Sequence, residues 1–352
     1  MKISIRTSRR IEDARNILIR GTNWIGDVIM TLPAMAAIRR AFPDAKISVL
    51  AKPWVADIFF LCSDVDEVIL YRSPGVHAGF GGLFRLAGEL RERKFDAAIL
   101  LQNAIEAAII SLLAGIPVRA GYNSDGRGPL LTHSVKRTRA VRRVHQVDYY
   151  LEMVKTLGCD GDSRELHLAM TQTDRDRADE ILRGYNIDPG GFLVGIAPGA
   201  TYGAAKKWFP DRFAAVADRL TDEFSAQVML FGSAGDRGST GEVSRCASHA
   251  LTDLAGMTNL REAISLISRC RLFISNDSGL MHVAGALDVP TLAIFGSTNP
   301  ITTSPLGKNS LVVHKDLPCS PCLKTTCPTD FRCMDMIGVE DVYGAARWLI
   351  TR

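Results

Sequence analysis

The feature that most constrains the fold is a regular alternation of short apolar segments with longer amphipathic ones along the whole chain. The apolar segments are rich in β-branched residues, as is typical of buried parallel strands, and the segments between them have helical periodicity. Strands are predicted at residues 17–20, 47–51, 67–71, 96–101, 118–121, 192–197, 227–231, 271–275 and 291–295. This alternation predicts an α/β fold in which helices cover both faces of doubly wound parallel sheets.

The length of the chain favours two such domains. A chain of 352 residues is too long for one ordinary core, and 47% hydrophobic residues are enough for two. The pair Gly190-Gly191, which follows Pro189 and a polar helix predicted at 174–185, is typical of a junction. We expect a first domain at 1–175, a second at 190–338 and a C-terminal helix at 339–352, the two doubly wound domains facing each other across a cleft.

Charge and hydropathy limit the partners. The net charge of +4 suits an anionic ligand or a membrane surface and is too weak to favour nucleic-acid binding. The first residues contain no apolar signal segment. The most apolar stretch, 97–118, is interrupted by Gln102, Asn103, Glu106 and Pro117, so it is interpreted as strand, helix and strand. We therefore expect a cytoplasmic protein that touches a membrane only peripherally.

Polar loops that contain glycine follow several of the predicted strands. In open α/β sheets, ligands bind outside the carboxyl ends of the strands. The first half has one such loop, at 21–27, which contains Asn23, Gly26 and Asp27. The second half has four, at 198–208, 232–236, 276–279 and 296–300. We expect these loops to converge on one cleft.

The second-half loops contain residues that suit a nucleotide diphosphate. Asp277, Ser278 and Gly279 precede a predicted helix whose free N–H groups could bind phosphate, although Asp277 or Ser278 could equally be only a helix cap. Lys206 and Lys207 could neutralise phosphate or be merely solvated.

Three further residues have two interpretations each. Asp236 could accept hydrogen bonds from ribose hydroxyls or cap a helix. Asp27 follows Gly26 at a helix start, where the helix dipole favours a carboxylate that could act as a general base, and capping is again the alternative. His282 lies one helical turn beyond Ser278 and could face the same site or be structural.

Two motifs could suggest a metal. Asp64-Val65-Asp66 has the D-x-D pattern, but it precedes a strand and so lies at the amino end of the sheet. Cys319-x2-Cys322-x4-Cys327-x5-Cys333 has a spacing compatible with a structural zinc site, and free or regulatory thiols are the alternative. We expect no catalytic metal.

Four blocks of the sequence together resemble one known family. They are IRGTNWIGDVIMTLPAMAAIRRAFP, APGATYGAAKKWFP, LAGMTNLREAISLISRCRLFISNDSGLMHVAGALDVPTLAIFGSTNP and CSPCLKTTCPTDFRCM. The chain resembles the ADP-heptose:lipopolysaccharide heptosyltransferases, glycosyltransferase family 9. Thr22-Asn23-Trp24 and the cysteine block are most similar to its heptosyltransferase II branch.

The resemblance implies a GT-B fold, with an N-terminal acceptor half and a C-terminal donor half, and an inverting transfer that needs no metal. It implies a role for each matching residue. Asp27 would be the base, and Lys206 of the K-x-W pattern would stabilise the diphosphate with Lys207 beside it. The donor phosphates would be held by Asp277, Ser278, Gly279 and His282, the ribose by Asp236 and the adenine by Thr258. Further substrate contacts would be Thr201, Asn23 and Gly26. No cofactor is implied beyond the donor, ADP-heptose.

The implied acceptor is a strongly anionic lipid A core that carries Kdo and a first heptose, met at the inner face of the cytoplasmic membrane. The basic run Lys136, Arg137, Arg139, Arg142, Arg143 and His145 could bind it or be a solvated loop. The alternatives are a different acceptor, as in heptosyltransferases I and III, or a nucleotide-sugar hydrolase or epimerase. A non-catalytic module that binds nucleotide sugar or nucleic acid is the alternative from another class.

Overall fold

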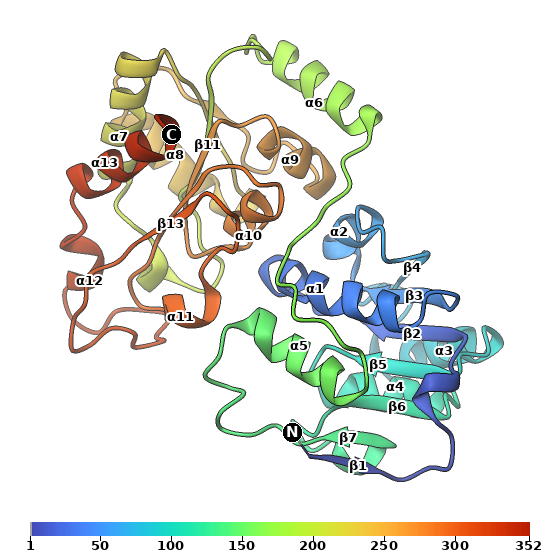
Figure 1. The fold of residues 1–352 in the computed structure, drawn as a ribbon. Coiled ribbons are helices and arrows are strands. Elements are labelled where there is room, and N and C mark those ends of the chain that lie inside the picture. The colour runs from blue at the N-terminus through green and yellow to red at the C-terminus, as the bar shows by residue number, and fades with distance from the viewer. Residues whose placement is uncertain (1) are drawn as a thin grey trace. The chain divides into compact units, whose positions relative to one another are not determined.

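The computed structural model describes residues 2–352, which form two compact units, each built around its own parallel sheet (Figure 1). The first unit ends at Ala169 and the second runs from Met170 to Arg352. Helix α6 (Gln172–Gly184) therefore belongs to the second unit, and the boundary lies before the limits of 175 and 190 expected from the sequence. The α/β fold of two doubly wound parallel sheets is confirmed.

The first unit contains a seven-stranded sheet in the order β1-β7-β6-β5-β2-β3-β4. Its strands are β1 (Ile3–Ile5), β2 (Asn16–Arg20), β3 (Lys46–Ala51), β4 (Glu67–Leu70), β5 (Ala97–Leu100), β6 (Val118–Tyr122) and β7 (His133–Val135). All neighbours are parallel except β1, which pairs antiparallel with β7 at the edge. This edge pair was not predicted, because both strands are short and β1 is largely exposed.

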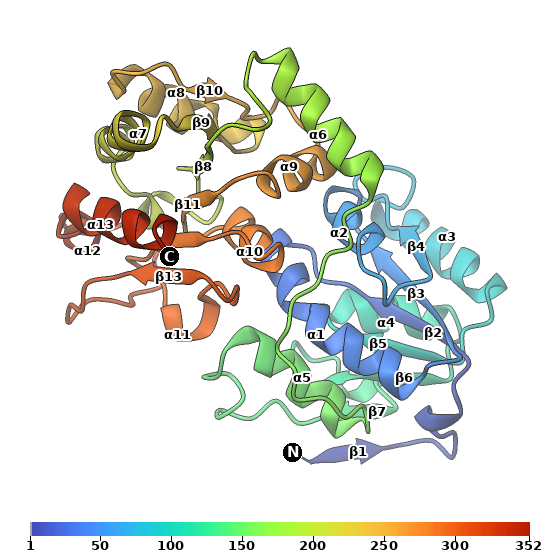
Figure 2. The same cartoon turned by 45° about the horizontal axis from the view of Figure 1, so that its top comes forward.

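Helices cover both faces of this sheet (Figures 1 and 2). They are α1 (Ile25–Ala41), α2 (Ala56–Phe60), α3 (Gly79–Glu92), α4 (Ile105–Leu113) and α5 (Gln146–Thr156). Helices α1 and α5 pack against each other, and α3 and α4 bury Leu86, Leu90 and Ile110 in one core with Leu18 and Leu100 of the sheet. The predicted strand, helix and strand at 97–118 are confirmed as β5, α4 and β6.

The second unit contains a six-stranded, all-parallel sheet in the order β10-β9-β8-β11-β12-β13. Its strands are β8 (Leu193–Ala197), β9 (Gln227–Leu230), β10 (Thr252–Asp253), β11 (Leu272–Asn276), β12 (Thr291–Ile294) and β13 (Ser310–Val313). Besides α6, its helices are α7 (Pro210–Phe224), α8 (Arg237–Cys246), α9 (Leu260–Ile267), α10 (Gly279–Ala286), α11 (Pro300–Thr303), α12 (Arg332–Asp335) and α13 (Val339–Ile350). Phe213 of α7, Val243 of α8 and Val342 of α13 share one core with the strands.

The strand orders locate where ligands can bind. Each unit begins its parallel sheet at a central strand, β2 or β8, and later strands add on both sides of it. The loops that leave β2 and β5 therefore diverge, as do those that leave β8 and β11. In an open α/β sheet this divergence opens a crevice at the carboxyl ends of the two strands, which is where ligands bind. None of the helices in residues 2–352 is long and apolar enough to cross a membrane.

An ion pair anchors the N-terminus of α6 within the second unit. Thr171 and Asp174 form a capping box, and Arg261 of α9 donates from Nε to Asp174 Oδ1 at 2.6 Å. The Arg261 guanidinium, with further hydrogen bonds from Thr171, lowers the pKa of Asp174 to about 2. A depressed carboxyl pKa contributes stability at pH values above its unfolded value of about 4, and this contribution is lost as the pH falls toward 2.

We expect Asp174→Asn to lower the free energy of unfolding by about 1–2 kcal/mol at pH 7. This is less than the full pKa shift of Asp174 would give, because Arg261 is half-exposed and solvent screens its charge. The difference from wild type should shrink when denaturation is repeated near pH 3. Asp176→Asn is the matched control, because Asp176 is exposed on the same helix and binds only Gln172 among the contacts described for residues 2–352. An equal loss in both variants would contradict this role of Asp174.

Candidate functional site

In the first unit, Asp27 lies in the first turn of α1, directly after the loop that follows β2. The N-cap of α1 is Trp24, which makes no side-chain capping bond, so the positive end of the helix dipole favours the ionised form of Asp27. The carboxylate also lies within electrostatic reach of Tyr150 of α5. Burial, and after it the negative charge of Asp27, raises the pKa of the Tyr150 phenol well above its ordinary value.

A cluster of buried charged side chains lies next to the loop that follows β2 and bonds to it. This cluster was not predicted from the sequence. Arg20 ends β2 almost fully buried and donates from Nη2 to Asn23 Oδ1 at 3.1 Å. Lys52 Nζ lies 3.5 Å from the centroid of the Tyr71 ring, and Tyr71 donates a hydrogen bond to Glu106. Burial lowers the pKa of Arg20 to about 10. A basic residue at the end of an otherwise apolar strand was the available signal.

Asn23 is held on both sides. Its side chain accepts from Arg20, and its main-chain carbonyl accepts from Trp54 Nε1 at 2.8 Å. The loop is further constrained at Gly21, where an added Cβ would lie 2.6 Å from the Phe59 ring. The loop before Asp27 is therefore a fixed structure, whose shape depends on Asn23.

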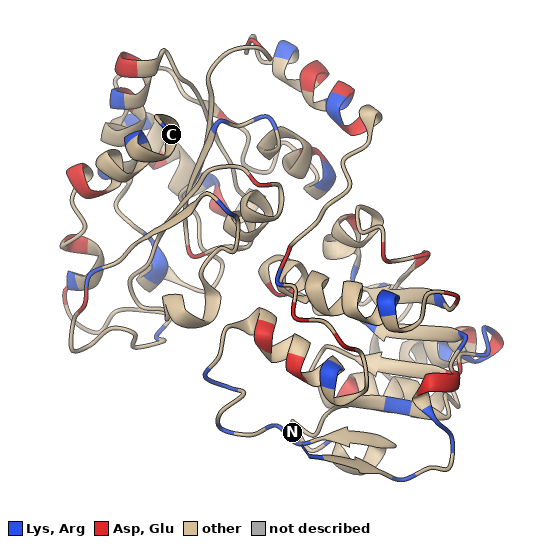
Figure 3. Ribbon diagram, in the orientation of Figure 1, with Lys and Arg blue, Asp and Glu red and all other residues tan. Residues whose placement is uncertain are grey.

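The predicted basic run forms the connection between β7 and α5 (Figure 3). Lys136, Arg137, Arg139, Arg142 and Arg143 are exposed. His145 differs from them, because it is buried and accepts from Val147 N as the N-cap of α5. The exposed members are accessible to an anionic partner, whereas the hydrogen bond of His145 stabilises the start of α5.

In the second unit, Lys206 and Asp277 come from the loops that follow the neighbouring strands β8 and β11. Lys206 Nζ lies 2.7 Å from Asp277 Oδ2, and the two side chains are only 14% and 7% exposed. This ion pair therefore lies at the carboxyl ends of β8 and β11, where the strand order predicts that a ligand binds. It brings together two residues that sequence reasoning assigned to the same diphosphate site.

Asn276 connects the same two loops and was given no role from the sequence. Its side chain is fully buried at the end of β11. Nδ2 donates to Pro198 O at 2.8 Å, and Oδ1 accepts from Trp208 N at 3.0 Å. A buried amide at the end of an apolar strand was the signal that could have identified it. Asn276 fixes both ends of the segment that carries Lys206.

The start of α10 retains its capacity to bind an anion. Ser278 is the N-cap, but it makes no side-chain capping bond, and its Oγ lies 2.9 Å from Ser275 Oγ. Ser278 is therefore the N-cap by position, while its hydroxyl bonds to Ser275 and not to the helix N–H groups. The N–H groups that begin at Gly279 are not used by that side chain and point, with the helix dipole, toward the crevice. His282 is buried one turn further along the helix.

Asp236 is the N-cap of α8 by position but makes no side-chain capping bond there, and its carboxylate instead closes a capping box with Ser233 at the preceding short turn, Ala234–Asp236. Its Oδ2 accepts from Ser233 N at 2.9 Å and from Ser233 Oγ at 2.7 Å. The same carboxyl group packs so closely on Gly199 that no Cβ would fit there, so the loops after β8 and β9 are in contact. The atom nearest to Gly199 is Oδ1, the carboxylate oxygen that does not accept from Ser233.

The remaining predicted substrate contacts are more dispersed. Lys207 Nζ donates to Ser239 Oγ of α8 at 2.9 Å and does not share the partner of Lys206. Thr201 is exposed in the turn after β8. Thr258 lies just before Asn259, the N-cap of α9, and lines a shallow pocket with Tyr185 and Met257.

The D-x-D segment is used for local structure. Asp66 Oδ2 accepts from Arg39 Nη2 at 2.6 Å and from Ile47 N at 2.7 Å. Although burial opposes the charge, these hydrogen bonds hold the pKa of Asp66 below its usual range. Across residues 2–352, no group of three or more histidine, cysteine or acidic side chains is arranged to hold a metal ion, the four clustered cysteines included.

Comparison with known proteins identifies the family to which this chain belongs. The model of glycosyltransferase family 9 (heptosyltransferase) matches residues 83–331, more than half of the chain. The lipopolysaccharide heptosyltransferase 2 of Salmonella typhimurium is 30% identical over 306 residues, which cover 85% of this chain and 87% of the relative. The lipopolysaccharide heptosyltransferase 1 of Pseudomonas aeruginosa is 28% identical over 335 residues, 88% of this chain and 87% of the relative.

The solved structure of Escherichia coli ADP-heptose LPS heptosyltransferase II is similar as well. It is 27% identical, with a TM-score of 0.82 over 96% of this chain and 98% of that one. The chain belongs to glycosyltransferase family 9, the heptosyltransferases, and the GT-B fold class expected from the sequence is confirmed.

Proposed function

We propose that this enzyme transfers heptose from ADP-L-glycero-D-manno-heptose to the first heptose of a Kdo-lipid A inner core of lipopolysaccharide. The observation that carries the donor half of this proposal is the Lys206–Asp277 ion pair beside the free N-terminus of α10. A cation and unpaired N–H groups in one partly buried crevice are the chemistry that a diphosphate requires. Relatives named for heptose transfer in lipopolysaccharide synthesis support the sugar and the pathway.

The donor would be held by residues of the second unit. Lys206 and the N–H groups at Ser278 and Gly279 would bind the diphosphate, with His282 and Asp277 fixing that site. Asp236 Oδ1 would accept from the ribose, Thr258 would contact the adenine, and Thr201 and Lys207 would line the entrance of the phosphate loop. No cofactor is needed, because ADP is a leaving group whose developing charge these groups can stabilise.

Asp27 would act as the general base. As the acceptor hydroxyl oxygen attacks the anomeric carbon, Asp27 accepts the hydroxyl proton, the bond from that carbon to the phosphate oxygen breaks, and ADP leaves. Attack from the face opposite ADP inverts the anomeric centre. Gly26 would be a further substrate contact beside the carboxylate, and Asn23 keeps the preceding loop in place.

The acceptor assignment rests on charge. A lipid A core carries phosphates and Kdo carboxylates, and the exposed residues Lys136, Arg137, Arg139, Arg142 and Arg143 offer five cations in one connection. Exposed lysine and arginine attract anionic headgroups as well as phosphorylated sugars. We place the enzyme in the cytoplasm, in peripheral contact with the inner face of the cytoplasmic membrane.

A transfer assay tests the proposal. The purified protein is supplied with ADP-heptose and with lipid A cores that carry either Kdo alone or Kdo and one heptose, and ADP release and product mass are measured. Release only with the heptose-bearing core supports the proposal. Release with Kdo alone would identify a heptosyltransferase I activity, which the 28% identity to the Pseudomonas aeruginosa relative keeps as the second candidate. Release without any acceptor would indicate a hydrolase, and ADP binding without release a binding module.

A further inference from the structure

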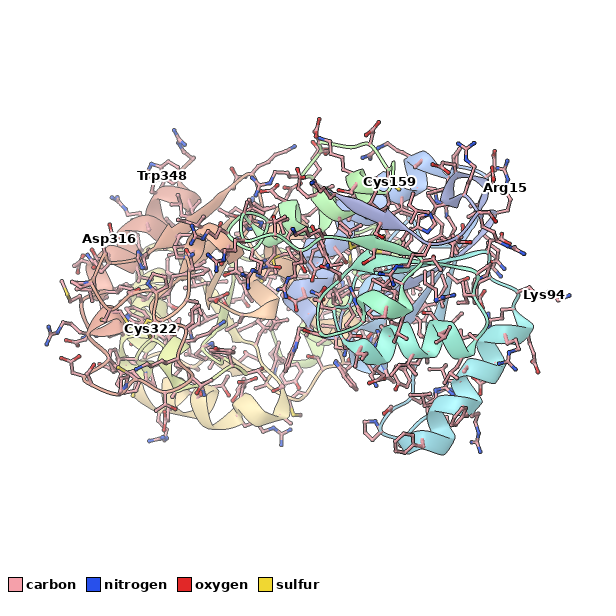
Figure 4. The ribbon with its side chains drawn as sticks, turned by 90° about the horizontal axis from the view of Figure 1, so that it is seen from below. Arg15, Lys94, Cys159, Asp316, Cys322 and Trp348 are labelled. Atoms are coloured by element: carbon pink, nitrogen blue, oxygen red, sulfur yellow. The ribbon has the colours of Figure 1, made fainter. Side chains whose placement is uncertain are left out.

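The cysteine-rich segment at 317–331, in the connection between β13 and α12, lies against the loops that hold the candidate donor residues. We call this segment the strap. Figure 4 labels Cys322 of the strap and Asp316, which directly precedes the strap. Cys319 and Cys322 are exposed and Cys327 is partly exposed. Since these thiols fill no core, the reason for the strap's position must come from what it touches.

The strap holds the turn that precedes Lys206. Ala205 N donates to Thr325 O at 3.0 Å, and Tyr202 OH donates to Leu323 O at 2.7 Å. The same strap residue ties this turn to the loop after β12, because Leu323 N donates to Ser297 O at 2.8 Å. The strap therefore bridges the loops after β8 and β12, which leave strands on either side of β11.

Gly203 shows how close this contact is. Its φ of +152° is in the region that side chains rarely adopt. A Cβ added there would overlap the main-chain carbonyl of Thr325, which is backbone and cannot rotate away. The turn and the strap thus fit together only with glycine at this position.

Tyr202 contacts both the strap and the ammonium group of Lys206. Its ring centroid lies 4.9 Å from Lys206 Nζ, within the range of a cation–π interaction. Tyr202 OH is bound to the strap and its ring faces Lys206, so one side chain joins the two. Lys206 is consequently oriented by Asp277 on one side and by Tyr202 on another.

We propose that the strap is a positioning element of the donor site, which acts through Tyr202 and Gly203 to hold Lys206 where it engages the diphosphate. The proposal rests on the proposed function in one respect only, namely that Lys206 binds the ADP part of the donor. Tyr202 is a positioning residue here, since it acts through Lys206.

The strap also contains the thiol of Cys327, whose reactivity can be measured to follow the conformation of the strap. Cys327 Sγ accepts from Phe331 N at 3.3 Å and lies 3.5 Å from Thr329 Oγ1. These hydrogen bonds, the one with Thr329 first, lower the pKa of Cys327 below its ordinary value, which favours its reaction with alkylating agents. Because coupling between two sites is reciprocal, a ligand that fixes the strap must also change the reactivity of a thiol whose hydrogen bonds belong to the strap.

The first test uses Tyr202→Phe and Gly203→Ala, with ADP affinity measured by calorimetry and donor KM and kcat measured by transfer. We expect Tyr202→Phe, which keeps the ring, to weaken ADP binding about three- to tenfold, as loss of one hydrogen bond does. Gly203→Ala should weaken it by more than tenfold and also lower the melting temperature, because the added Cβ overlaps the backbone of Thr325. Tyr202→Phe should raise donor KM at an unchanged melting temperature, so it is the variant that separates positioning from folding. Gly241→Ala of α8 is the control, because an added Cβ meets nothing within 4 Å there.

Unchanged ADP affinity in both variants, with wild-type binding intact, would overturn the strap proposal alone. A wild-type protein that does not bind ADP would overturn the proposed function, and the strap's role with it. Tyr202→Leu, which removes ring and hydroxyl together, should bind ADP more weakly than Tyr202→Phe, because the contact with Lys206 is also lost.

The second test measures alkylation of Cys327 by iodoacetamide, in which the thiolate displaces iodide, with peptide mass spectrometry as the readout. Saturating ADP should change the rate at Cys327 severalfold and leave Cys246 unaffected, because Cys246 is exposed at the end of α8, outside the strap. Equal rates at Cys327 with and without ADP would contradict the linkage between strap and donor site.

Discussion

Replacing Asp27 with asparagine is expected to slow heptose transfer by about 10²–10⁴-fold, the range that a positioned general base contributes. Asparagine has nearly the same shape as aspartate, so it preserves the first turn of α1 and its contacts. It cannot accept the proton of the acceptor hydroxyl. Because the candidate donor residues lie in the second unit, the affinity for ADP should stay within about twofold of wild type, a change of only ~0.4 kcal/mol. Single-turnover transfer and calorimetric ADP titration measure the two effects.

Asp57→Asn provides the matched control for Asp27. Asp57 lies in the first turn of α2, in the same unit, and is likewise half-buried near a helix N-terminus. Its replacement removes the same charge from an equivalent helix position without touching the loop after β2. Transfer at the wild-type rate by Asp27→Asn would contradict the assignment of the base, and an equal loss in Asp57→Asn would indicate an electrostatic effect on the whole unit.

The parallel sheets could be predicted because their strands are apolar on both faces. Strands β3, β5, β8 and β11 are almost entirely buried, so their sequences are mostly apolar on both faces and are distinct from the amphipathic helices. The edge pair β1 and β7 lacks this signal. Ile5 of β1 is more than half exposed, and each strand has only three residues. Short edge strands depend on a pairing partner that the local sequence does not specify.

The candidate site could be predicted to the level of loops but not of contacts. Lys206 and Asp277 both follow apolar strands, which was sufficient to place them at the carboxyl end of the sheet. Their 2.7 Å ion pair depends on β8 and β11 being neighbours, and nothing local to either strand encodes that order. For Asp236 the sequence could not indicate that one carboxylate oxygen accepts from Ser233 and that the group packs against Gly199 of the neighbouring loop. The contacts between the strap and the turn before Lys206 join residues more than a hundred positions apart, beyond the reach of local patterns.

Replacing Lys206 with methionine should produce the second large effect, a loss of about 10²–10³-fold in transfer rate together with much weaker ADP binding. Methionine keeps most of the apolar stem and removes the charge that neutralises the leaving diphosphate. The change also leaves Asp277 buried without its cation, and breaking a buried pair in this way costs about 3–5 kcal/mol of stability. Lys207→Met is the control, because Lys207 Nζ binds Ser239 of α8 instead of the ion pair.

A double variant separates the stability effect from the ligand effect. In Lys206→Met with Asp277→Asn, no buried charge remains unpaired, so the free energy of unfolding should recover toward the wild-type value. ADP affinity should stay low, because the cation that binds the diphosphate is still absent. Recovery of ADP binding in the double variant would mean that Lys206 acts only by neutralising Asp277. Greater damage from Lys207→Met than from Lys206→Met would move the diphosphate contact to the neighbouring lysine. The combination of recovered stability and persistent loss of binding is the result that only a direct role of Lys206 at the diphosphate produces.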